Sequence, residues 1–277
     1  MKIELIDYQA DDAREALARS LHNTGFAVLK NHPISADRIQ EIYDSWAGFF
    51  ASDDKHNWLR DPDNHDGYFP FRSENAKDRT QKDLKEFYHV YPWGRVPDSL
   101  ADVTRAMQDD LTRLGVELLG WLQDETPDDV KSQFTMPLDE MMAESLQSLL
   151  RILHYPPVEE DIEEGAIRAA AHEDINLITL LLAGSQPGLQ AQDSQGNWHD
   201  ISCDAGMITI NNGDMLALAS QHYFPSTTHR VVNPDAHANQ SRYSMPIFLH
   251  PRPDVMLDKD LSAGDYLQQR LKEIGLK

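Results

Sequence analysis

The sequence predicts a mainly β fold: a jelly-roll-like barrel of short strands with a helical N-terminal layer and a C-terminal helix. Helical periodicity dominates the first half of the 277 residues, whereas short β-compatible runs follow one another after about residue 147. Many short strands separated by turn signals are typical of antiparallel sandwiches and barrels. We therefore expect residues 1–146 to pack on residues 147–277 as one structural unit.

The N-terminal region is expected to begin with a helix and a strand. Residues 11–22 carry Ala and Leu at helical spacing, and the following Asn-Thr-Gly sequence supplies a stop signal. The short apolar run 26–29 then suits a buried strand. A second helix is predicted from Ser35, with its apolar residues on one face.

Further along, residues 100–123 repeat the helical pattern. The sequence 126–129 (TPDD) resembles a helix start, with Thr126 as N-cap, a first-turn proline and two acids. Segment 53–97, between the helix predicted from Ser35 and the helix predicted at 100–123, shows no clear periodicity of apolar residues. We expect it to form loops and short strands.

The second region is predicted to consist of short strands followed by a helix. Turn residues such as Pro156-Pro157 and Asn212-Gly213-Asp214 separate most of the strands. The final helix, about 260–274, is amphipathic. The predicted strands are 149–155, 167–171, 178–182, 188–192, 197–201, 207–210, 215–219, 227–232 and 244–249.

The amino-acid composition limits the classes of partner that the protein is expected to bind. The 25 Lys and Arg against 46 Asp and Glu give a net charge of −21, which repels nucleic acid and anionic lipid. No apolar run reaches the roughly 18–20 residues that cross a bilayer. The single cysteine, Cys203, excludes an internal disulfide, and the acidic start does not look like a secretory signal. We expect a cytoplasmic protein without nucleic-acid or membrane partners.

A candidate metal site opens the β-rich half. His172 and Asp174 point to the same side of an extended chain because side chains alternate along a strand. A third ligand must come from another strand, and His229 is the candidate. Two histidines and one carboxylate leave adjacent coordination positions open, the pattern of Fe(II) enzymes that activate oxygen. Zinc would favour a closed tetrahedron or a single open position.

The sequence around these residues resembles the isopenicillin N synthase-like family of iron and 2-oxoglutarate-dependent oxygenases. Matching motifs occur in the family's order over about residues 3–253. They are 150–157 (LRILHYPP), 172–181 (HEDINLITLL), 188–190 (GLQ), 196–198 (GNW), 210–214 (INNGD), 229–231 (HRV) and 242–246 (RYSMP).

The resemblance implies a double-stranded β-helix core in which His172, Asp174 and His229 bind Fe(II). It also implies that Arg242 and Ser244 receive the distal carboxylate of 2-oxoglutarate. A guanidinium can bind a carboxylate through two hydrogen bonds, and a hydroxyl two residues further along a strand shares its face.

Other pocket residues follow from the same resemblance. Tyr155 matches a family tyrosine that reaches the same carboxylate. Arg151 lies four residues earlier, on the same face of an extended chain, and is predicted to line the co-substrate pocket. Lys85 and Glu86 are expected to face the substrate pocket, which segment 53–97 is expected to line.

The family's chemistry implies an O2-dependent dioxygenase that converts 2-oxoglutarate to succinate and CO2. A small-molecule substrate would be hydroxylated, desaturated or cyclised. One alternative remains an iron-dependent oxidase of the same family, which would take electrons from its substrate or from ascorbate. Another alternative is a metal-binding jelly roll that acts only as a sensor or binding module. A zinc hydrolase would give Arg242 no task. A monomer is the family's default.

Several positions depart from the family pattern. Glu173 stands where the family often has Thr, and Gln221-His222 stands where it has Asn-Gly before the distal histidine. None of these departures affects the metal ligands or the Arg-x-Ser pair. They indicate a distance from the plant hormone and flavonoid enzymes, so the substrate is not predicted.

Overall fold

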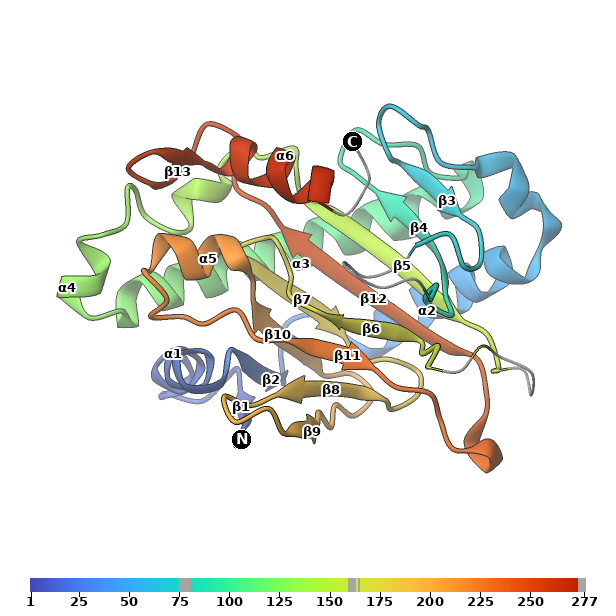
Figure 1. Cartoon of the computed structure of the whole chain (residues 1–277), viewed down its shortest axis with the longest axis horizontal. Helices are drawn as coiled ribbons and strands as arrows, with labels where there is room; N and C mark the ends of the chain where they lie inside the picture. The colour runs from blue at the N-terminus through green and yellow to red at the C-terminus, as the bar shows by residue number, and fades with distance from the viewer. Residues whose placement is uncertain (75–80, 159–162, 164, 274–277) are drawn as a thin grey trace.

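The computed structural model describes residues 1–74, 81–158, 163 and 165–273. Two sheets face each other and helices cover the outer side of the larger one (Figure 1). The eight-stranded sheet has the order β1 (Glu4–Asp7), β2 (Phe26–Lys30), β10 (Ile208–Asn212), β7 (Ile178–Leu182), β12 (Arg242–Leu249), β5 (Leu149–Tyr155), β4 (Glu86–Val90), β3 (Gly67–Phe69). The smaller sheet has the order β6 (Ala169–His172), β11 (His229–Val231), β8 (Leu189–Gln192), β9 (Trp198–Asp200). The expected jelly-roll core with helices at both ends is confirmed.

Strand alternation divides the large sheet into an outer and an inner face. On β12 the outward residues Met245, Ile247 and Leu249 belong to the main hydrophobic core shared with the helices. The alternate residues, from Arg242 to Phe248, line a pocket on the inner face. The same division holds on β5, which pairs with β12 in antiparallel register. The two central strands therefore carry the core on one side and the polar pocket on the other.

Three helices pack on the outer face: α1 (Ala13–Thr24), α2 (Ala36–Ala51) and α3 (Asp98–Glu125). Ser35 caps α2 by accepting a hydrogen bond from the Arg38 amide. α3 approaches the sheet closely at Gly115, where an added Cβ would lie 2.0 Å from Leu249 Cδ1. Within the described residues, no helix is long and apolar enough to span a membrane.

The remaining elements are short. They are the helices α4 (Asp128–Lys131), α5 (Asp214–Ala219) and α6 (Ala263–Glu273), the 3-10 turns Asp53–Trp58, Glu140–Met142 and Ala236–Ala238, and the hairpin β13 (Met256–Asp258) with β14 (Leu261–Ser262). α6 confirms the predicted C-terminal helix, whose last residue, 274, lies outside the described residues. So do residues 75–80 of the predicted segment 53–97, whose described part forms loops, a 3-10 turn and two strands as expected.

Two predicted elements are corrected by the structure. Residues 215–219 form helix α5 and not a strand, because the run MLALA is made of good helix formers and follows an acidic first-turn residue, Asp214. Thr126 does not cap α4, because its hydroxyl donates to the Leu122 carbonyl at the end of α3. Short apolar runs are ambiguous between helix and strand when periodicity alone is considered.

The first 146 residues supply more strands than expected. β1 was not predicted, and it pairs in parallel with β2 at one edge of the large sheet. β3 and β4 form the opposite edge, where β4 pairs with β5. Strands from the N-terminal region therefore extend the sheet that carries the pocket on both sides.

Candidate metal centre

Three potential metal ligands converge between the two sheets. His172, Asp174 and His229 each offer a ligand atom, and the three atoms lie within 4.8 Å of one another. Asp174 Oδ1 lies 3.8 Å from His172 Nε2 and 3.7 Å from His229 Nε2. His172 and His229 are paired across β6 and β11 in the small sheet, whereas Asp174 comes from the turn before β7. The predicted residues are therefore brought together by three separate segments.

Backbone carbonyls orient both imidazoles. His172 Nδ1 donates to the Ala170 carbonyl at 2.8 Å, and His229 Nδ1 donates to the Thr227 carbonyl at 3.0 Å. The proton is thus fixed on Nδ1 in each ring, so that Nε2 presents a free lone pair toward Asp174. Each histidine bonds the residue two positions before it, which is a local contact that an extended chain provides.

The outer oxygen of Asp174 is held by two side chains. Asp174 Oδ2 accepts hydrogen bonds from Thr179 Oγ1 at 2.6 Å and from Asn211 Nδ2 at 2.8 Å. These bonds leave Oδ1 facing the two histidines. Sequence reasoning assigned no role to Thr179 or Asn211, although both stand in motifs that resemble the family, 172–181 and 210–214. Their position in those motifs is the signal that could have identified them.

The ionisation of these groups suits a divalent cation. Burial and the neighbouring His229 lower the pKa of His172, although 41% of its side chain stays accessible. Burial alone would raise the pKa of Asp174, but the two imidazoles and the bonds from Thr179 and Asn211 lower it. Neutral imidazoles and an ionised carboxylate are the forms that ligate metals. Two histidines and one carboxylate fit Fe(II) and leave positions for small ligands.

A cavity beside the triad collects the predicted co-substrate residues. Its lining includes all three metal ligands together with Tyr155, Arg242 and Ser244. Arg242 is paired with Tyr155 across β12 and β5, and its guanidinium carbon lies 5.3 Å from the centre of the tyrosine ring. The structure therefore places Arg242, Ser244 and Tyr155 on one wall, within the pocket that holds the triad.

The Arg242 guanidinium is buried and incompletely bonded. Its Nε donates to the Gln186 carbonyl at 2.9 Å, while Nη1 is buried without a partner among the described residues. It packs against Gly184, where an added Cβ would lie 2.8 Å from Nη2. A buried cation with an unused donor is costly unless an anion binds it. These features fit a carboxylate ligand such as the distal end of 2-oxoglutarate.

Arg151 and Lys85 line the same cavity, but both already contact acidic groups. Arg151 lies four residues from Tyr155, about 13 Å along the strand. Its role toward the co-substrate stays a prediction. Glu86 is not part of the cavity lining, because successive residues of a strand point to opposite faces. It bonds Lys55, Tyr68 and His154 instead.

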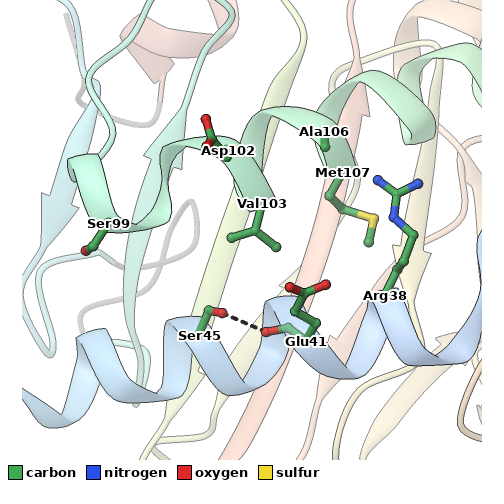
Figure 2. Close-up of a pocket in the computed structure, with 8 residues that line it drawn as sticks. All are labelled: Arg38, Glu41, Ser45, Ser99, Asp102, Val103, Ala106 and Met107. Carbon is green, nitrogen blue, oxygen red and sulfur yellow. Dashed lines mark hydrogen bonds between the residues drawn. The ribbon is translucent and has the colours of Figure 1, made fainter.

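A larger hollow, of about 410 Å³, lies elsewhere, between α2 and α3. Figure 2 shows Arg38 and Glu41 of α2 pointing toward α3, from which Val103 and Met107 point back toward them. None of its lining residues belongs to the metal cluster or to the Arg242 pocket. We therefore place the chemistry in the cavity between the sheets.

Comparisons with protein families agree with this site. Residues 146–251 match the 2OG-Fe(II) oxygenase superfamily, a span that contains the triad and Arg242. Residues 3–109 match the N-terminal domain of the non-haem dioxygenases in morphine synthesis. Together the two matches cover α1, α2 and the start of α3, both edges of the large sheet and the jelly-roll core.

Solved structures of similar proteins lead to the same family. A protein from Shewanella oneidensis described as an oxygenase is 49% identical, with a TM-score of 0.90 and 100% of both chains covered. A protein of the 2OG-Fe(II) oxygenase family from Caulobacter crescentus is 30% identical, with a TM-score of 0.81 over 98% of this chain and 99% of its own. A protein from Neurospora crassa, solved with alpha-ketoglutarate and thymine, is 27% identical, with a TM-score of 0.79 over 98% and 96%. This chain belongs to the 2OG-Fe(II) oxygenase superfamily and is a non-haem Fe(II)- and 2-oxoglutarate-dependent oxidoreductase.

Proposed function

We propose that His172, Asp174 and His229 bind the Fe(II) of this dioxygenase, and that Arg242, Ser244 and Tyr155 hold the distal carboxylate of 2-oxoglutarate. The observation that carries the proposal is that one cavity contains both groups of residues, with the three ligand atoms within 4.8 Å of one another. The unused Nη1 donor of Arg242 supports the second half of the proposal.

The protein's part in the reaction is to bind, orient and exclude water. Fe(II) with 2-oxoglutarate supplies oxygen activation and the oxidation of a small-molecule substrate, with release of succinate and CO2. Thr179 and Asn211 fix the Asp174 carboxylate, and the Ala170 and Thr227 carbonyls fix the imidazoles. Arg242 supplies a charge-assisted bond that selects a dicarboxylic co-substrate.

The apolar lining of the cavity keeps water away from the reacting groups. Leu153, Leu181, Leu189 and Val231 surround the triad together with the polar residues. Because a wall that excludes water lowers the local dielectric constant, it strengthens electrostatic contacts to a bound anion. It also protects the oxidised substrate from side reactions. Whether the product is hydroxylated, desaturated or cyclised depends on the substrate.

We further propose a monomeric, cytoplasmic enzyme in which residues 1–146 and 147–277 act as one unit. Its net charge of −21 argues against nucleic acid and anionic membranes as partners. Strands from both regions share the large sheet, which supports their folding together. Light scattering and a cell fractionation would test the monomer and the location.

Turnover of 2-oxoglutarate tests the proposed roles. We expect O2 uptake and succinate formation with Fe(II) but not with Zn(II). With Fe(II), slow turnover should occur even in the absence of a substrate. His229→Ala and Arg242→Ala should lose this turnover, whereas His199→Ala, at a histidine paired with Asp193 outside the cavity, should keep it. Succinate formation that survives His229→Ala would contradict the assignment. O2 uptake without 2-oxoglutarate consumption would indicate an oxidase that uses another reductant.

A further inference from the structure

Two cations lie in the cavity apart from the predicted co-substrate anchor. Arg151, on β5, and Lys85, just before β4, both line the cavity that holds the metal triad. Lys85 Nζ lies 2.9 Å from Asp83 Oδ2, and Asp83 Oδ1 accepts a hydrogen bond from the Ala170 amide. The Ala170 carbonyl in turn accepts from His172 Nδ1. The lysine is thus tied to the strand that carries a metal ligand.

Both cations converge on one carboxylate, that of Glu74. Glu74 Oε2 lies 2.8 Å from Lys85 Nζ and 3.4 Å from Arg151 Nη1, and Oε1 lies 3.5 Å from Arg151 Nη2. A lysine and both ends of a guanidinium around one carboxylate form a complete binding site for that group. Glu74 itself is not among the residues that line the cavity. The chain's own carboxylate therefore occupies an anion site that opens toward the metal.

The charges at this site balance only while Glu74 is present. Two cations, Lys85 and Arg151, face two carboxylates, Asp83 and Glu74. The fifth group, His89, accepts a bond from Arg151 Nε at 2.9 Å, and burial lowers the pKa of this histidine, so it is neutral. Without Glu74 the group carries one surplus positive charge. The site therefore matches a single monoanion.

Aromatic and apolar side chains flank the anion site. The Arg151 guanidinium carbon lies 4.7 Å from the centre of the Phe87 ring and 5.6 Å from that of Phe248. Phe248 and Pro246 continue the cavity wall along β12 toward Ser244. A ligand that binds Arg151 through a charged end would thus lay an apolar body along this wall. The Phe248 end of this wall lies beside the triad, because Phe248 is paired with Thr179, which bonds Asp174.

We propose that the substrate is a small organic acid with an apolar body, whose carboxylate replaces that of Glu74 on Arg151 and Lys85. This inference rests on the proposed function, since the triad defines which end of the cavity is reactive. Glu74 then acts as an internal competitor that neutralises the site when no substrate is bound. Arg151 becomes a specificity-determining residue for the substrate.

The test compares acids with their uncharged amides. Matched pairs of aliphatic and aromatic compounds, such as hexanoate with hexanamide and 3-phenylpropanoate with 3-phenylpropanamide, are titrated calorimetrically into the anaerobic protein saturated with Fe(II) and 2-oxoglutarate. We expect at least one acid to bind about tenfold or more tightly than its amide. The visible band of the Fe(II) 2-oxoglutarate complex should persist, which shows that the acid has not displaced the co-substrate.

Substitutions separate a binding site from a structural ion-pair network. Glu74→Gln removes the competitor and should tighten acid binding about tenfold, whereas Arg151→Gln should weaken it about tenfold or more. Glu4→Gln is the matched control, because its ion pair with Arg19 lies on β1 at the opposite edge of the large sheet. Glu4→Gln should leave the affinity for the acid unchanged. A purely structural network would make Glu74→Gln weaken binding, as Arg151→Gln does.

Three results would overturn the inference. They are equal binding of acid and amide, weaker acid binding in Glu74→Gln, and no acid binding to wild type or Glu74→Gln at up to about 10 mM. If any of them occurs while the visible band still forms, the substrate inference fails and the proposed function stands. If the band does not form in the wild-type protein, the proposed function itself fails.

Discussion

At the residue scale, Asp174 depends on partners that are not themselves metal ligands. Thr179 and Asn211 both donate to its outer oxygen, and Asp174 and Thr179 are buried. Such contacts orient a ligating carboxylate and tune its basicity. The proposed metal centre therefore extends beyond its three candidate ligands to residues on β7 and β10.

Thr179→Val should weaken metal binding with little change in fold. The substitution keeps the shape of the side chain and removes one of the two donors to Asp174 Oδ2, so we expect Fe(II) affinity to fall about 10–100-fold. Competition with a coloured chelator under anaerobic conditions measures this. Thr112→Val, on α3, is the control and should leave affinity unchanged. Equal affinities for all three proteins would show that the Thr179 bond does not support the metal.

Arg242→Met separates binding from stability. The substitution should lower 2-oxoglutarate affinity about 100-fold or more, because it removes a buried charged donor. The unfolding temperature of the metal-free protein should not fall, because the substitution removes a buried cation whose Nη1 has no hydrogen-bond partner in the described part of the chain. Isothermal calorimetry and thermal denaturation measure the two effects.

The control for this variant is Arg252→Met. Arg252 Nη1 donates to the carbonyls of Glu140 and Ala143, outside the cavity. Its loss should lower the unfolding temperature and leave 2-oxoglutarate affinity intact. An Arg242→Met protein that loses stability but keeps its affinity would assign Arg242 a structural role.

At the element scale, the start of α5 is locked to the segment that carries Asp174. The Gly213 amide donates to the Leu177 carbonyl, and the Asp214 amide donates to the Asp174 carbonyl at 2.7 Å. An added Cβ at Gly213 would lie 2.1 Å from the Asn176 carbonyl oxygen. Only glycine allows this approach of two backbones.

Gly213→Ala is therefore expected to displace the Asp174 segment. We expect a loss of about 2 kcal/mol or more in the free energy of unfolding, together with weaker Fe(II) binding. Gly120→Ala, within α3 at a position where no atom of the described residues lies within 4 Å of the added Cβ, should instead stabilise the protein by about 0.5–1 kcal/mol. Urea denaturation measures both. A Gly213→Ala protein as stable as Gly120→Ala would contradict the tight packing at this turn.

The sequence predicted elements best where side-chain period and turn residues agree. The helices from residues 11 and 35 and the strands 149–155 and 178–182 match the structure within a few residues, because amphipathic spacing and stop signals coincide there. The run 215–219 was assigned wrongly, since five apolar residues fit either a helix or a strand. Gln221 and His222, which depart from the family, adopt left-handed backbone angles with φ of 50° and 63°, the conformation that Asn and Gly favour.

The candidate site shows the same division between local and long-range information. The alignment of Arg242 with Ser244 follows from positions two apart on β12. Asp174 lies beyond the end of β6, so its place beside His172 is set by the turn before β7 and not by strand alternation as the sequence predicted. The role of Asn211, and the ion pair from Glu74 to Arg151, depend on contacts between segments far apart in sequence. Such contacts are set by sheet order, which spacing along one chain does not encode.

At the scale of the whole molecule, a buried ion-pair cluster joins the N-terminal layer to the barrel. Glu86 on β4 bonds Lys55 at 3.0 Å, His154 on β5 at 2.7 Å, and the Tyr68 hydroxyl on β3. Burial raises the pKa of Glu86, but the bonds from His154, Tyr68 and Lys55 outweigh it and lower the pKa. The carboxylate is thus more stable in the folded protein than in the unfolded chain.

This cluster predicts a pH dependence of stability. Because the folded pKa of Glu86 lies below its unfolded value of about 4.3, its contribution is present above that value and is lost as the pH falls through the folded pKa. We expect the metal-free wild type to be more stable than Glu86→Gln near neutral pH, where the variant leaves the partly buried Lys55 without its carboxylate partner. The difference should shrink as the pH falls from about 5 through the folded pKa of Glu86. Urea denaturation across this range measures it, and a constant difference would show that Glu86 is not the titrating group.

The central claim is that one cavity binds Fe(II) through His172, Asp174 and His229 and binds 2-oxoglutarate through Arg242. The most direct test adds Fe(II) and 2-oxoglutarate to metal-free protein without oxygen and records the visible charge-transfer band of the chelate. The account predicts a band in the wild type, none in His229→Ala, and one that needs far more 2-oxoglutarate in Arg242→Ala. Bound Fe(II) without a band in the wild type, or a band that persists unchanged in Arg242→Ala, would contradict it.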